Sequence, residues 1–524
     1  MKRYIFLILI CAFISSNIKA QSFEWLQTVE IDYEYNPNMI SYTSCVNPQG
    51  GNYFYGTQEH ITFYNESMGV LFLRKIGPEG EEVWSRSITG QSSVKGITSS
   101  DAGDVYIAGQ MLTDVNFWGE DSLVKMGIGT DAFIAKVSTD GSLLWSINLS
   151  SLSMGEGNIA ELAIHGEMLY AAYSTWLNSY VLIFSMDGQY LQSVEQLDVN
   201  IISGITFDNE GNLYTTGSCA GYESEFGGVS HPAPFSYTTY LVKYNSDYQP
   251  EWVKFIEDIT CTFPNVKTDG SGGIYFAGPL LAETLFDTIN VNGPDWVYDF
   301  YLARLDQEGN FEWVVECPEG SGGDATVGNL HFLDTDVNGN AILAGFTRGL
   351  VDWGNDVVSD VTGNYQDIII WSYSQEGMAN WVKTAGGEQF DLPNSISVSS
   401  DGNAYIAGII SGEVAFDTIV YETEGYYEPF LAKLELDILS GISKPASDNA
   451  VLVYPNPAVD RISIINNEKY EHFFLLNLTG TIIKSGYLNS GRTEIDLINL
   501  APGYYLFQMT NNEHQFLSRQ IIVQ

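Results

Sequence analysis

Short runs of apolar residues separated by Gly, Asp and Asn turns fill most of this chain of 524 residues. One octapeptide, a turn followed by an apolar strand, begins at residues 49, 102, 165, 210, 271, 338 and 401. In chain order it reads QGGNYFYG, AGDVYIAG, HGEMLYAA, EGNLYTTG, SGGIYFAG, NGNAILAG and DGNAYIAG. The copies start about 59 residues apart on average, and internal periods of this length are typical of propellers and solenoids.

A second pattern follows each octapeptide: an apolar strand, a turn usually centred on Gly, and a strand that usually carries Trp. FLRKIGPEGEEVW (72–84) and YLARLDQEGNFEW (301–313) are clear copies, whereas YVLIFSMDGQYLQ (180–192) lacks the Trp. No segment between the copies has the helical period of apolar residues, so each repeat predicts four short antiparallel strands. Four such strands per repeat, arranged radially, form a blade of a β-propeller.

The last repeat ends at Asp437 without a Trp-bearing strand, and a segment of that type stands at the other end of the chain. SFEWLQTVE (22–30) matches NFEWVVE (310–316). We expect the N-terminal strand to complete the last blade, which removes the free edges of the ring. The predicted fold is all-β, with a seven-bladed β-propeller over residues 21–437. A solenoid is the alternative, but its terminal repeats would need polar caps. The repeats resemble the bacterial seven-bladed propeller repeat family, often found in surface and secreted proteins.

The N-terminal residues 1–20, MKRYIFLILICAFISSNIKA, have the three parts of a secretory signal peptide. Lys2 and Arg3 precede an apolar run, and Ala20 ends a cleavage site before Gln21. No later stretch has the about 18 apolar residues that a membrane span needs. The export route permits disulfides, but the cysteine spacing predicts no zinc site, and unpaired thiols are favoured. The cysteines of the mature chain are Cys45, Cys219, Cys261 and Cys317.

The composition changes after the predicted propeller, through a linker of residues 438–450. Alternating apolar residues with Gly, Asn and Pro turns over residues 451–524 predict a small Ig-like β-sandwich. This segment resembles the C-terminal sorting domain of the type IX secretion system of Bacteroidetes, and an ordinary sandwich module is the alternative. The matching residues are Tyr454, Pro455, Asn456, Pro457, Asp460, Leu478, Gly480, Leu500, Gly503 and Tyr504. The resemblance implies passage through the periplasm and across the outer membrane by the type IX machinery, followed by release or tethering at the surface.

Charge narrows the choice of partners. The formal net charge is −43, and residues 21–437 hold 13 Lys/Arg against 58 Asp/Glu. A field of this sign repels nucleic acid and anionic membranes, so nucleic-acid binding is excluded. Five of those cations occupy one position of the strand after the octapeptide, and these are Lys75, Lys136, Lys243, Arg304 and Lys433. They predict either structural pairs with turn carboxylates, which we favour, or a ring of charge that holds an anion.

One segment has partial metal-binding character. DTDVNGN (334–340) begins like an EF-hand loop, with Asp334, Asp336 and Asn338 at ligand positions. Its twelfth position is Gly345 rather than Glu, and the segment coincides with a repeat turn. A turn is therefore favoured over a calcium site, and no other cofactor is expected.

Modification and catalysis are less sharply indicated. Three Asp-Ser/Thr-apolar segments resemble O-glycosylation sites of Bacteroidetes, although turn chemistry explains them equally well. Their hydroxyl residues are Ser122, Thr288 and Thr418. No Ser/His/Asp or Cys/His grouping is readable, and no catalytic residue is assigned.

The expected function is binding. We expect a monomeric exported module for adhesion to polysaccharide or to a surface protein. A secreted polysaccharide hydrolase or lyase is the alternative, and a non-catalytic surface scaffold is a third, because propellers host all three. Converging acids of raised pKa in the channel would favour an enzyme. A groove rimmed with exposed Tyr and Trp would favour carbohydrate binding.

Overall fold

The structure is a computed structural model of the chain. It describes residues 21–29, 41–63, 66–119, 121–219, 223–232, 238–256, 263–293, 298–318, 322–361, 365–424, 427–436, 451–454, 461–466, 470–477, 482–489, 491–498, 500, 503–510 and 516–523. The predicted signal peptide, the linker and Cys261 lie outside these residues. So do four positions of the predicted sorting motif, Pro455, Asn456, Pro457 and Asp460, and Leu478 and Gly480 of its central turn.

The chain consists of two compact units, Met1–Ile438 and Leu439–Gln524. The described residues of both units are almost entirely strands and turns, with one 3₁₀ turn at Leu149–Ser151. The all-β prediction is therefore confirmed. No helix in the described part of the chain has the length and hydropathy needed to cross a membrane.

In the N-terminal unit, the described strands pair into seven antiparallel groups of four. Within each group the strands are numbered from the innermost to the outermost. Group 1 contains β2 (Tyr42–Val46), β3 (Asn52–Phe63), β4 (Glu66–Ile76) and the first half of β5 (Glu82–Ser99). Group 2 contains the second half of β5, β6 (Val105–Met111), β9 (Asp131–Val137) and β10 (Leu143–Asn148). Group 3 contains β11 (Asn158–His165), β12 (Met168–Ser174), β13 (Ser179–Ser185) and β14 (Tyr190–Leu197). Group 4 contains β15 (Ile201–Phe207), β16 (Leu213–Cys219), β19 (Thr238–Tyr244) and β20 (Pro250–Ile256).

The last three groups follow the same order. Group 5 contains β21 (Asn265–Thr268), β22 (Ile274–Pro279), β25 (Phe300–Leu305) and β26 (Phe311–Glu316). The first strand of group 6 is divided into β27 (Asp324–Val327) and β28 (Leu333–Thr335), which both pair with β29 (Ala341–Gly354). Group 6 continues with β31 (Asp367–Tyr373) and β32 (Ala379–Gly387). Group 7 contains β33 (Leu392–Val398), β34 (Asn403–Ile410), β37 (Glu428–Glu435) and β1 (Ser22–Thr28).

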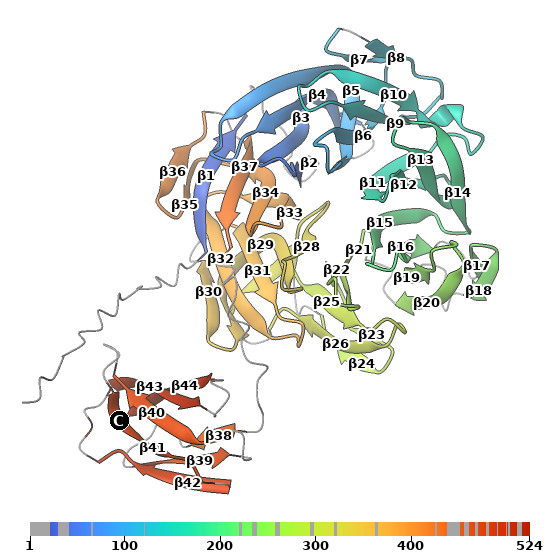
Figure 1. The fold of residues 1–524 in the computed structure, drawn as a ribbon. Helices are drawn as coiled ribbons and strands as arrows, with labels where there is room; N and C mark the ends of the chain where they lie inside the picture. The colour runs from blue at the N-terminus through green and yellow to red at the C-terminus, as the bar shows by residue number, and fades with distance from the viewer. Residues whose placement is uncertain are drawn as a thin grey trace, which may run out of the picture. The chain divides into compact units, whose positions relative to one another are not determined.

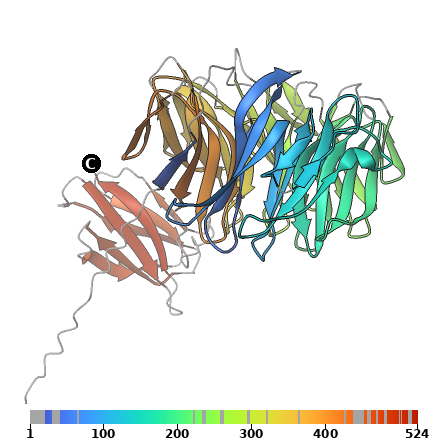
Figure 2. The same cartoon turned by 90° about the horizontal axis from the view of Figure 1, so that it is seen from above.

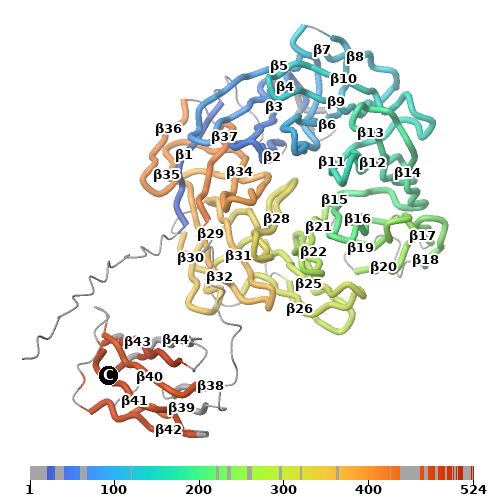
Figure 3. The backbone as a smooth tube through the Cα atoms, in the orientation of Figure 1, coloured from blue at the N-terminus to red at the C-terminus, as the bar shows by residue number. Residues whose placement is uncertain are grey.

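The groups are arranged in a ring, with their first strands innermost (Figure 1). These first strands contact one another in cyclic order, from β2 through β5, β11, β15, β21, β28 and β33 back to β2. Strand β1 pairs antiparallel with β37, from Ser22 opposite Glu435 to Thr28 opposite Phe430, as the backbone trace also shows (Figure 3). The predicted pairing of the N-terminal strand with the last repeat is thus confirmed. Figure 2 shows the strands running between the two faces of the ring.

Two glycines of the octapeptide occupy positions where a side chain would be strained or would overlap the backbone. Gly211 has φ +82° in the turn between the first two strands of group 4, a conformation that costs other residues energy. The closing glycine meets a different demand, since a Cβ at Gly217 would overlap the carbonyl oxygen of Ile201 on the innermost strand. The repeat therefore encodes a tight turn and a close approach between the first two strands.

Tryptophan joins neighbouring groups. The indole N–H of Trp252 on β20 donates to the carbonyl oxygen of Gln307 at 2.9 Å. Gln307 lies in the turn between the third and fourth strands of the next group. The Trp252 ring packs against Gly309, where a Cβ would lie 2.8 Å from the indole. The same bond from one group to the next is made by Trp25, Trp84, Trp145 and Trp313. This contact, here called the Trp latch, explains why the predicted Trp and the predicted Gly turn recur together.

A further hairpin, here called an outer hairpin, follows the second strand in several groups and was not predicted. The strands are β7 (Val115–Phe117) with β8 (Asp121–Leu123), β17 (Glu223–Phe226) with β18 (Val229–Pro232), β23 (Thr284–Phe286) with β24 (Ile289–Val291), and β35 (Glu413–Phe416) with β36 (Ile419–Glu422). In group 6, β30 (Val357–Val361) pairs with the extension of β29. Strands β7, β17 and β35 pair with the outermost strand of the preceding group, so these hairpins cover edges that would otherwise be free.

The C-terminal unit has two antiparallel sheets. One contains β38 (Val451–Tyr454), β39 (Arg461–Asn466) and β42 (Gly491–Asp496). The other contains β41 (Ile482–Tyr487), β40 (His472–Leu476), β43 (Gly503–Thr510) and β44 (Phe516–Val523). Ile464 from the first sheet and Leu475 and Phe507 from the second are fully buried in one shared core. Apolar residues at alternate positions of the strands supply this core.

Candidate functional site

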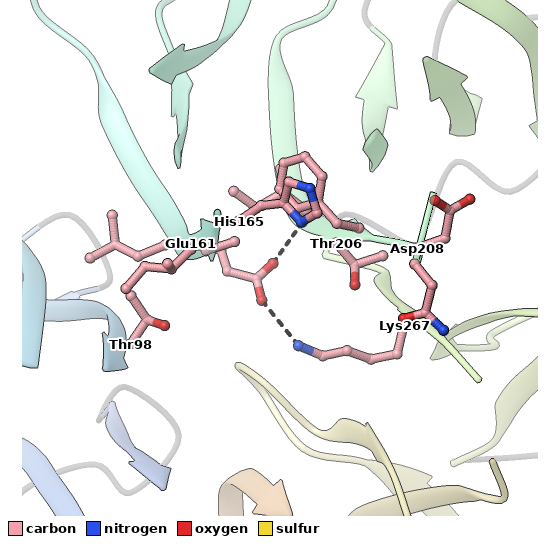
Figure 4. Close-up of a pocket in the computed structure, with 12 residues that line it drawn as sticks. Thr98, Glu161, His165, Thr206, Asp208 and Lys267 are labelled. Atoms are coloured by element: carbon pink, nitrogen blue, oxygen red, sulfur yellow. Dashed lines mark hydrogen bonds and ion pairs between the residues drawn. The ribbon is translucent and has the colours of Figure 1, made fainter. Parts of the chain in front are cut away.

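A pocket of about 460 Å³ opens between the innermost strands of groups 2 to 5. Its lining comes from β5, β11, β15 and β21 and from the turn that follows β15 (Figure 4). The side chains that define its character are Thr98, Glu161, His165, Thr206, Phe207 and Lys267. Because four groups contribute to it, the pocket lies toward the axis of the ring.

Glu161 is the central acid of the pocket and is only 8% exposed. One carboxylate oxygen, Oε2, accepts the backbone N–H of Ile205 on the next group at 2.7 Å. The other, Oε1, lies 3.6 Å from Nζ of Lys267, two groups away, as the dashed lines in Figure 4 indicate. A buried carboxylate needs such partners, and those of Glu161 come from two other groups of the ring.

Lys267 lies between two acids. Burial alone would lower its pKa, but the charges of Glu161 and Asp334 outweigh burial and raise the pKa. Asp334 of group 6 accepts the backbone N–H of Val398 at 2.8 Å and that of Thr335 at 2.9 Å. Burial raises the pKa of Asp334, and the attraction of Lys267 only partly opposes this. The cluster therefore holds one cation against two acids.

His331 lies beside these charges, and Glu161, Lys267, Asp334 and His331 are together called the axial cluster here. Its Nδ1 lies 3.1 Å from Oγ1 of Thr43 in group 1, and the backbone of Ala160 in group 3 also hydrogen-bonds the ring. The residue itself belongs to group 6, just before β28. An imidazole that reaches two groups from a third must lie near the axis. Burial lowers its pKa, and the neighbouring Lys267 acts in the same direction while Glu161 opposes it.

The rim of the pocket is aromatic and polar. The imidazole of His165 stacks on the ring of Phe207, with centroids 4.5 Å apart and planes 13° apart. Asp208 also lines the pocket, but its carboxylate accepts the N–H groups of Glu210 and Asn212 at 3.0 and 2.9 Å. Burial alone would raise the pKa of Asp208, and the hydrogen bonds outweigh it and lower the pKa. Asp208 is therefore a turn residue rather than a free acid.

The pocket offers both donors and acceptors at short range. Glu161 contributes an acceptor, Lys267 contributes ammonium protons, and the hydroxyls of Thr98 and Thr206 can do either. Glu161 and Asp334 each hold backbone N–H groups, which ties their carboxylates to the frame of the ring. Such an arrangement suits recognition of a polar ligand better than proton transfer by a free acid.

The five repeated cations lie within the groups and not in the described pocket. In group 2, Lys136 stands in register with Tyr106 and Trp145, lies over the Tyr106 ring and pairs with Asp104 at 3.1 Å. The equivalent partners are Thr139 O for Lys75, Glu251 for Lys243, Asp269 and Glu312 for Arg304, and Pro78 O for Lys433. These contacts favour structural pairs over an anion-binding ring.

The predicted calcium ligands point to separate partners. Asp334 belongs to the axial cluster, whereas Asp336 accepts the N–H groups of Asn338 and Asn340, each at 2.9 Å, within its own turn. Among the residues that the structure describes, no group of three or more His, Cys, Asp or Glu side chains could hold a metal ion. The EF-hand-like segment is a hairpin turn here, and a role in calcium binding stays a prediction.

The three hydroxyl residues of the glycosylation prediction are exposed. Ser122 lies in β8, and Thr288 and Thr418 lie in the turns of the β23–β24 and β35–β36 hairpins. The preceding Asp287 and Asp417 pair with Lys254 and Lys383 of the preceding group, so the acid has a structural role. Glycan attachment at the exposed hydroxyls stays a prediction.

Cys45, Cys219 and Cys317 are free thiols. Burial raises the pKa of Cys219 and Cys317 to about 12, which makes these thiols unreactive. The predicted preference for unpaired thiols is confirmed for these three. In the C-terminal unit, Tyr454 ends β38, Gly503 and Tyr504 begin β43, and Leu500 packs against the core.

Of the axial cluster, the sequence analysis singled out only Asp334, and as a calcium ligand. Glu161, Lys267 and His331 come from three repeats, and they occupy positions where the other repeats carry different residues. The available signal was the rarity of Lys and His in so acidic a chain, which singles out any that fall on an innermost strand.

Residues 452–524 match the family described as the secretion system C-terminal sorting domain. The C-terminal segment is a type IX sorting domain. The chain is therefore exported by type IX secretion to the cell surface or beyond it. No protein with a curated description matches the chain.

Among solved structures, PorZ of Porphyromonas gingivalis, a surface component of the type IX secretion system, is 12% identical over 92% of this chain and 70% of that chain, with a TM-score of 0.29. A protein of unknown function from Bacteroides caccae is 13% identical over 53% of this chain and 81% of its own, with a TM-score of 0.31. Another from Bacteroides thetaiotaomicron is 11% identical over 76% and 100%, with a TM-score of 0.30. Similarities at these TM-scores carry no conclusion about function.

Proposed function

We propose that the N-terminal unit is a seven-bladed β-propeller that binds polysaccharide in its axial pocket after export, and that the C-terminal unit is an Ig-like sandwich that directs this export. The domain boundaries would be residues 21–437 and 451–524, joined by the linker 438–450. The observation that carries the binding function is the pocket around Glu161 and Lys267.

Support for the propeller comes from the pairing of strands. Seven groups of four strands, cyclic contact between their first strands, and the β1–β37 pair are the features of a closed ring of blades. The hydrophobic clusters lie between neighbouring groups, as with Tyr275 of group 5 and Trp371 of group 6. Blades packed face to face in this way leave the axis for polar residues.

Support for polysaccharide comes from the chemistry of the pocket. A sugar ring presents hydroxyl groups that donate and accept, and the pocket supplies an acid, an ammonium and two threonine hydroxyls. The stacked His165 and Phe207 add an apolar surface at the rim. A hydrolase would need a free acid beside the substrate, and both Glu161 and Asp334 are engaged by backbone N–H groups.

A protein ligand is the second candidate, and one loop favours it. Trp176 and Leu177, in the turn between β12 and β13, are 90% and 60% exposed. Exposed aromatic and apolar side chains of this kind are common at protein interfaces. This loop connects the second and third strands, whereas the pocket opens near the turns that follow the first strands.

The test is binding of the mature chain, residues 21–524, to an array of glycans and polysaccharides. We expect at least one polysaccharide to bind and a Thr98→Val/Thr206→Val double variant to bind about tenfold less tightly, because two hydroxyl contacts are lost. Trp176→Ser is the matched control and should bind as the wild type does. Absence of any binding, or equal binding by the double variant, would refute the proposal.

The same array run with calcium and with a chelator tests the metal prediction. Calcium-dependent binding would restore Asp334 and Asp336 as ligands. Binding that is indifferent to calcium would leave both as hydrogen-bonding turn and strand residues.

A further inference from the structure

We infer that the axial pocket recognises the terminal residue of an uncharged glycan, end-on, rather than a stretch within the chain. This inference rests on the proposed function and deepens it, because it names which part and which class of polysaccharide the pocket takes. It follows from the side-chain links across the axis, from the balance of charge around the pocket and from the groups that line it.

Side chains from several groups are linked to one another across the axis beside the pocket. Glu161 spans from group 3 to the backbone of Ile205 in group 4 and toward Lys267 in group 5. His331 spans from group 6 to Thr43 in group 1 and to the backbone of Ala160 in group 3. A polysaccharide cannot thread an axis that is crossed in this way, so only a chain end can enter.

Further hydrogen bonds join the innermost strands of neighbouring groups. Asn265 of group 5 accepts the backbone N–H of Phe332 at 3.0 Å and donates to the carbonyl oxygen of Leu330 at 2.9 Å, both in group 6. The backbone N–H of Leu330 in turn reaches the carbonyl oxygen of Asn394 in group 7 at 3.0 Å. The innermost strands of groups 5, 6 and 7 are therefore fixed to one another beside the axis.

The charges around the pocket disfavour ionic sugars. Lys267 is the cation of the cluster, and its charge is already offset by Glu161 and Asp334. A uronic acid would meet these two acids and a ring with 58 acidic against 13 basic residues. An amino sugar is attracted by the acidic field of the ring, but its ammonium would lie beside that of Lys267, which already occupies the position between Glu161 and Asp334. An uncharged residue meets neither repulsion.

The lining matches a ring of hydroxyl groups. Lys267 makes a contact of 3.6 Å to Glu161, too long to use its ammonium protons fully, and its side chain is 27% exposed. Thr98 and Thr206 face the same pocket from two other groups. A volume of about 460 Å³ lies at the low end of small-ligand pockets, which suits one or two sugar rings.

The experiment is saturation-transfer NMR on the mature chain, residues 21–524, with single sugars as probes. The uncharged probes are glucose, galactose, mannose, xylose and N-acetylglucosamine, and the charged controls are glucuronate and glucosamine. We expect transfer to at least one uncharged sugar, at least a fivefold weaker signal from both charged sugars, and displacement of the array polysaccharide by the uncharged sugar that binds. The Thr98→Val/Thr206→Val variant should lose the transfer, and Thr418→Val, on an outer hairpin, should keep it.

The outcomes separate this inference from the proposed function. If the polysaccharide binds and the pocket variant abolishes this binding, but no single sugar binds or competes, the end-on inference is overturned while the function stands. Stronger binding of glucuronate or glucosamine than of every uncharged sugar also overturns it, as does transfer that survives in the pocket variant. If no polysaccharide binds on the array and no sugar shows transfer, the proposed function itself has failed.

Discussion

Lys267 holds its charge between two acids from other parts of the ring, and this position makes a stability prediction. We expect Lys267→Met to lower the free energy of unfolding by about 2–3 kcal/mol, because Glu161 and Asp334 are then left as buried charges without a cation. Urea unfolding followed by tryptophan fluorescence measures this loss.

Lys254→Met is the matched control for that experiment. Lys254 pairs with Asp287 at 2.7 Å, but Asp287 is 46% exposed on an outer hairpin. The control should change stability by no more than about 0.5 kcal/mol, because exposed pairs contribute little. Equal losses in the two variants would show that the axial cluster is no more buried than the surface.

A second pair of acids, outside the pocket, predicts a pH dependence. A Cβ on Gly386 would lie 2.7 Å from the carboxyl carbon of Asp367 and 2.9 Å from Oδ2 of Asp391, so the two carboxyl groups flank one backbone position. Burial raises the pKa of Asp367 to about 7. Burial and the charge of Asp367 raise that of Asp391 to about 8, against the opposing N–H groups of Ser411 and Gly387.

Both acids are protonated in the folded chain at a pH where the unfolded chain has released the protons. Because the folded pKa lies above the unfolded value of about 3.9, the contribution of these two acids to stability is greatest at low pH and falls as pH rises toward 8. We expect Asp367→Asn to have the wild-type stability near pH 4 and to exceed it by about 1–2 kcal/mol at pH 8. A difference that does not change with pH would contradict this account of the pair.

The Trp latch determines how neighbouring groups are held together, and glycine makes it testable. Gly309 has φ +82° and packs under Trp252, whereas Gly228 has φ +84° and no atom within 4 Å of an added Cβ. Gly228→Ala should cost about 1 kcal/mol from the backbone alone. Gly309→Ala should cost about 1–3 kcal/mol more, because the methyl group displaces the indole.

Thermal or urea unfolding of the two variants isolates the packing contribution, since their backbone angles are nearly equal. Equal losses would mean that the ring of Trp252 moves freely and that the latch does not stabilise the junction between groups.

At the scale of the element, the sequence predicted the strands and turns that recur in the repeats. It missed the hairpins that differ from repeat to repeat. Trp252 and Gly309 recur with their surroundings, so their strands and turn could be predicted from spacing alone. The β17–β18 hairpin could not, because its short polar strands are stabilised by pairing with the preceding group rather than by their own pattern. Tertiary contact supplies what local propensity lacks there.

At the scale of the whole molecule, the ring could be predicted from the repeats, whereas the pocket could not. Seven copies of one octapeptide predicted repeated four-stranded groups, and the match between residues 22–30 and 310–316 predicted their closure. Glu161, Lys267 and His331 each break the repeat, and the first two line the pocket. These three side chains lie close together only because the ring brings their repeats together, and no local sequence pattern predicts this proximity.

Export gives a prediction that belongs to the entire chain. Deletion of residues 452–524 removes the sorting domain, so the remaining chain should accumulate in the periplasm instead of reaching the surface or the medium. Cell fractionation and immunoblotting measure the distribution. A full-length chain with Trp252→Phe controls for reduced stability and should still be exported. Appearance of the truncated chain in the medium at the wild-type level would contradict the assignment.

Hydrogen–deuterium exchange tests the central claim, that the axis of the ring is the binding site, most directly. It compares the mature chain alone and with the polysaccharide that gives the strongest array signal. We predict slower exchange in β11, β15 and β21, which line the pocket, and unchanged exchange in the outer hairpins and residues 451–524. Protection confined to the Trp176 loop or to the outer hairpins would contradict the account.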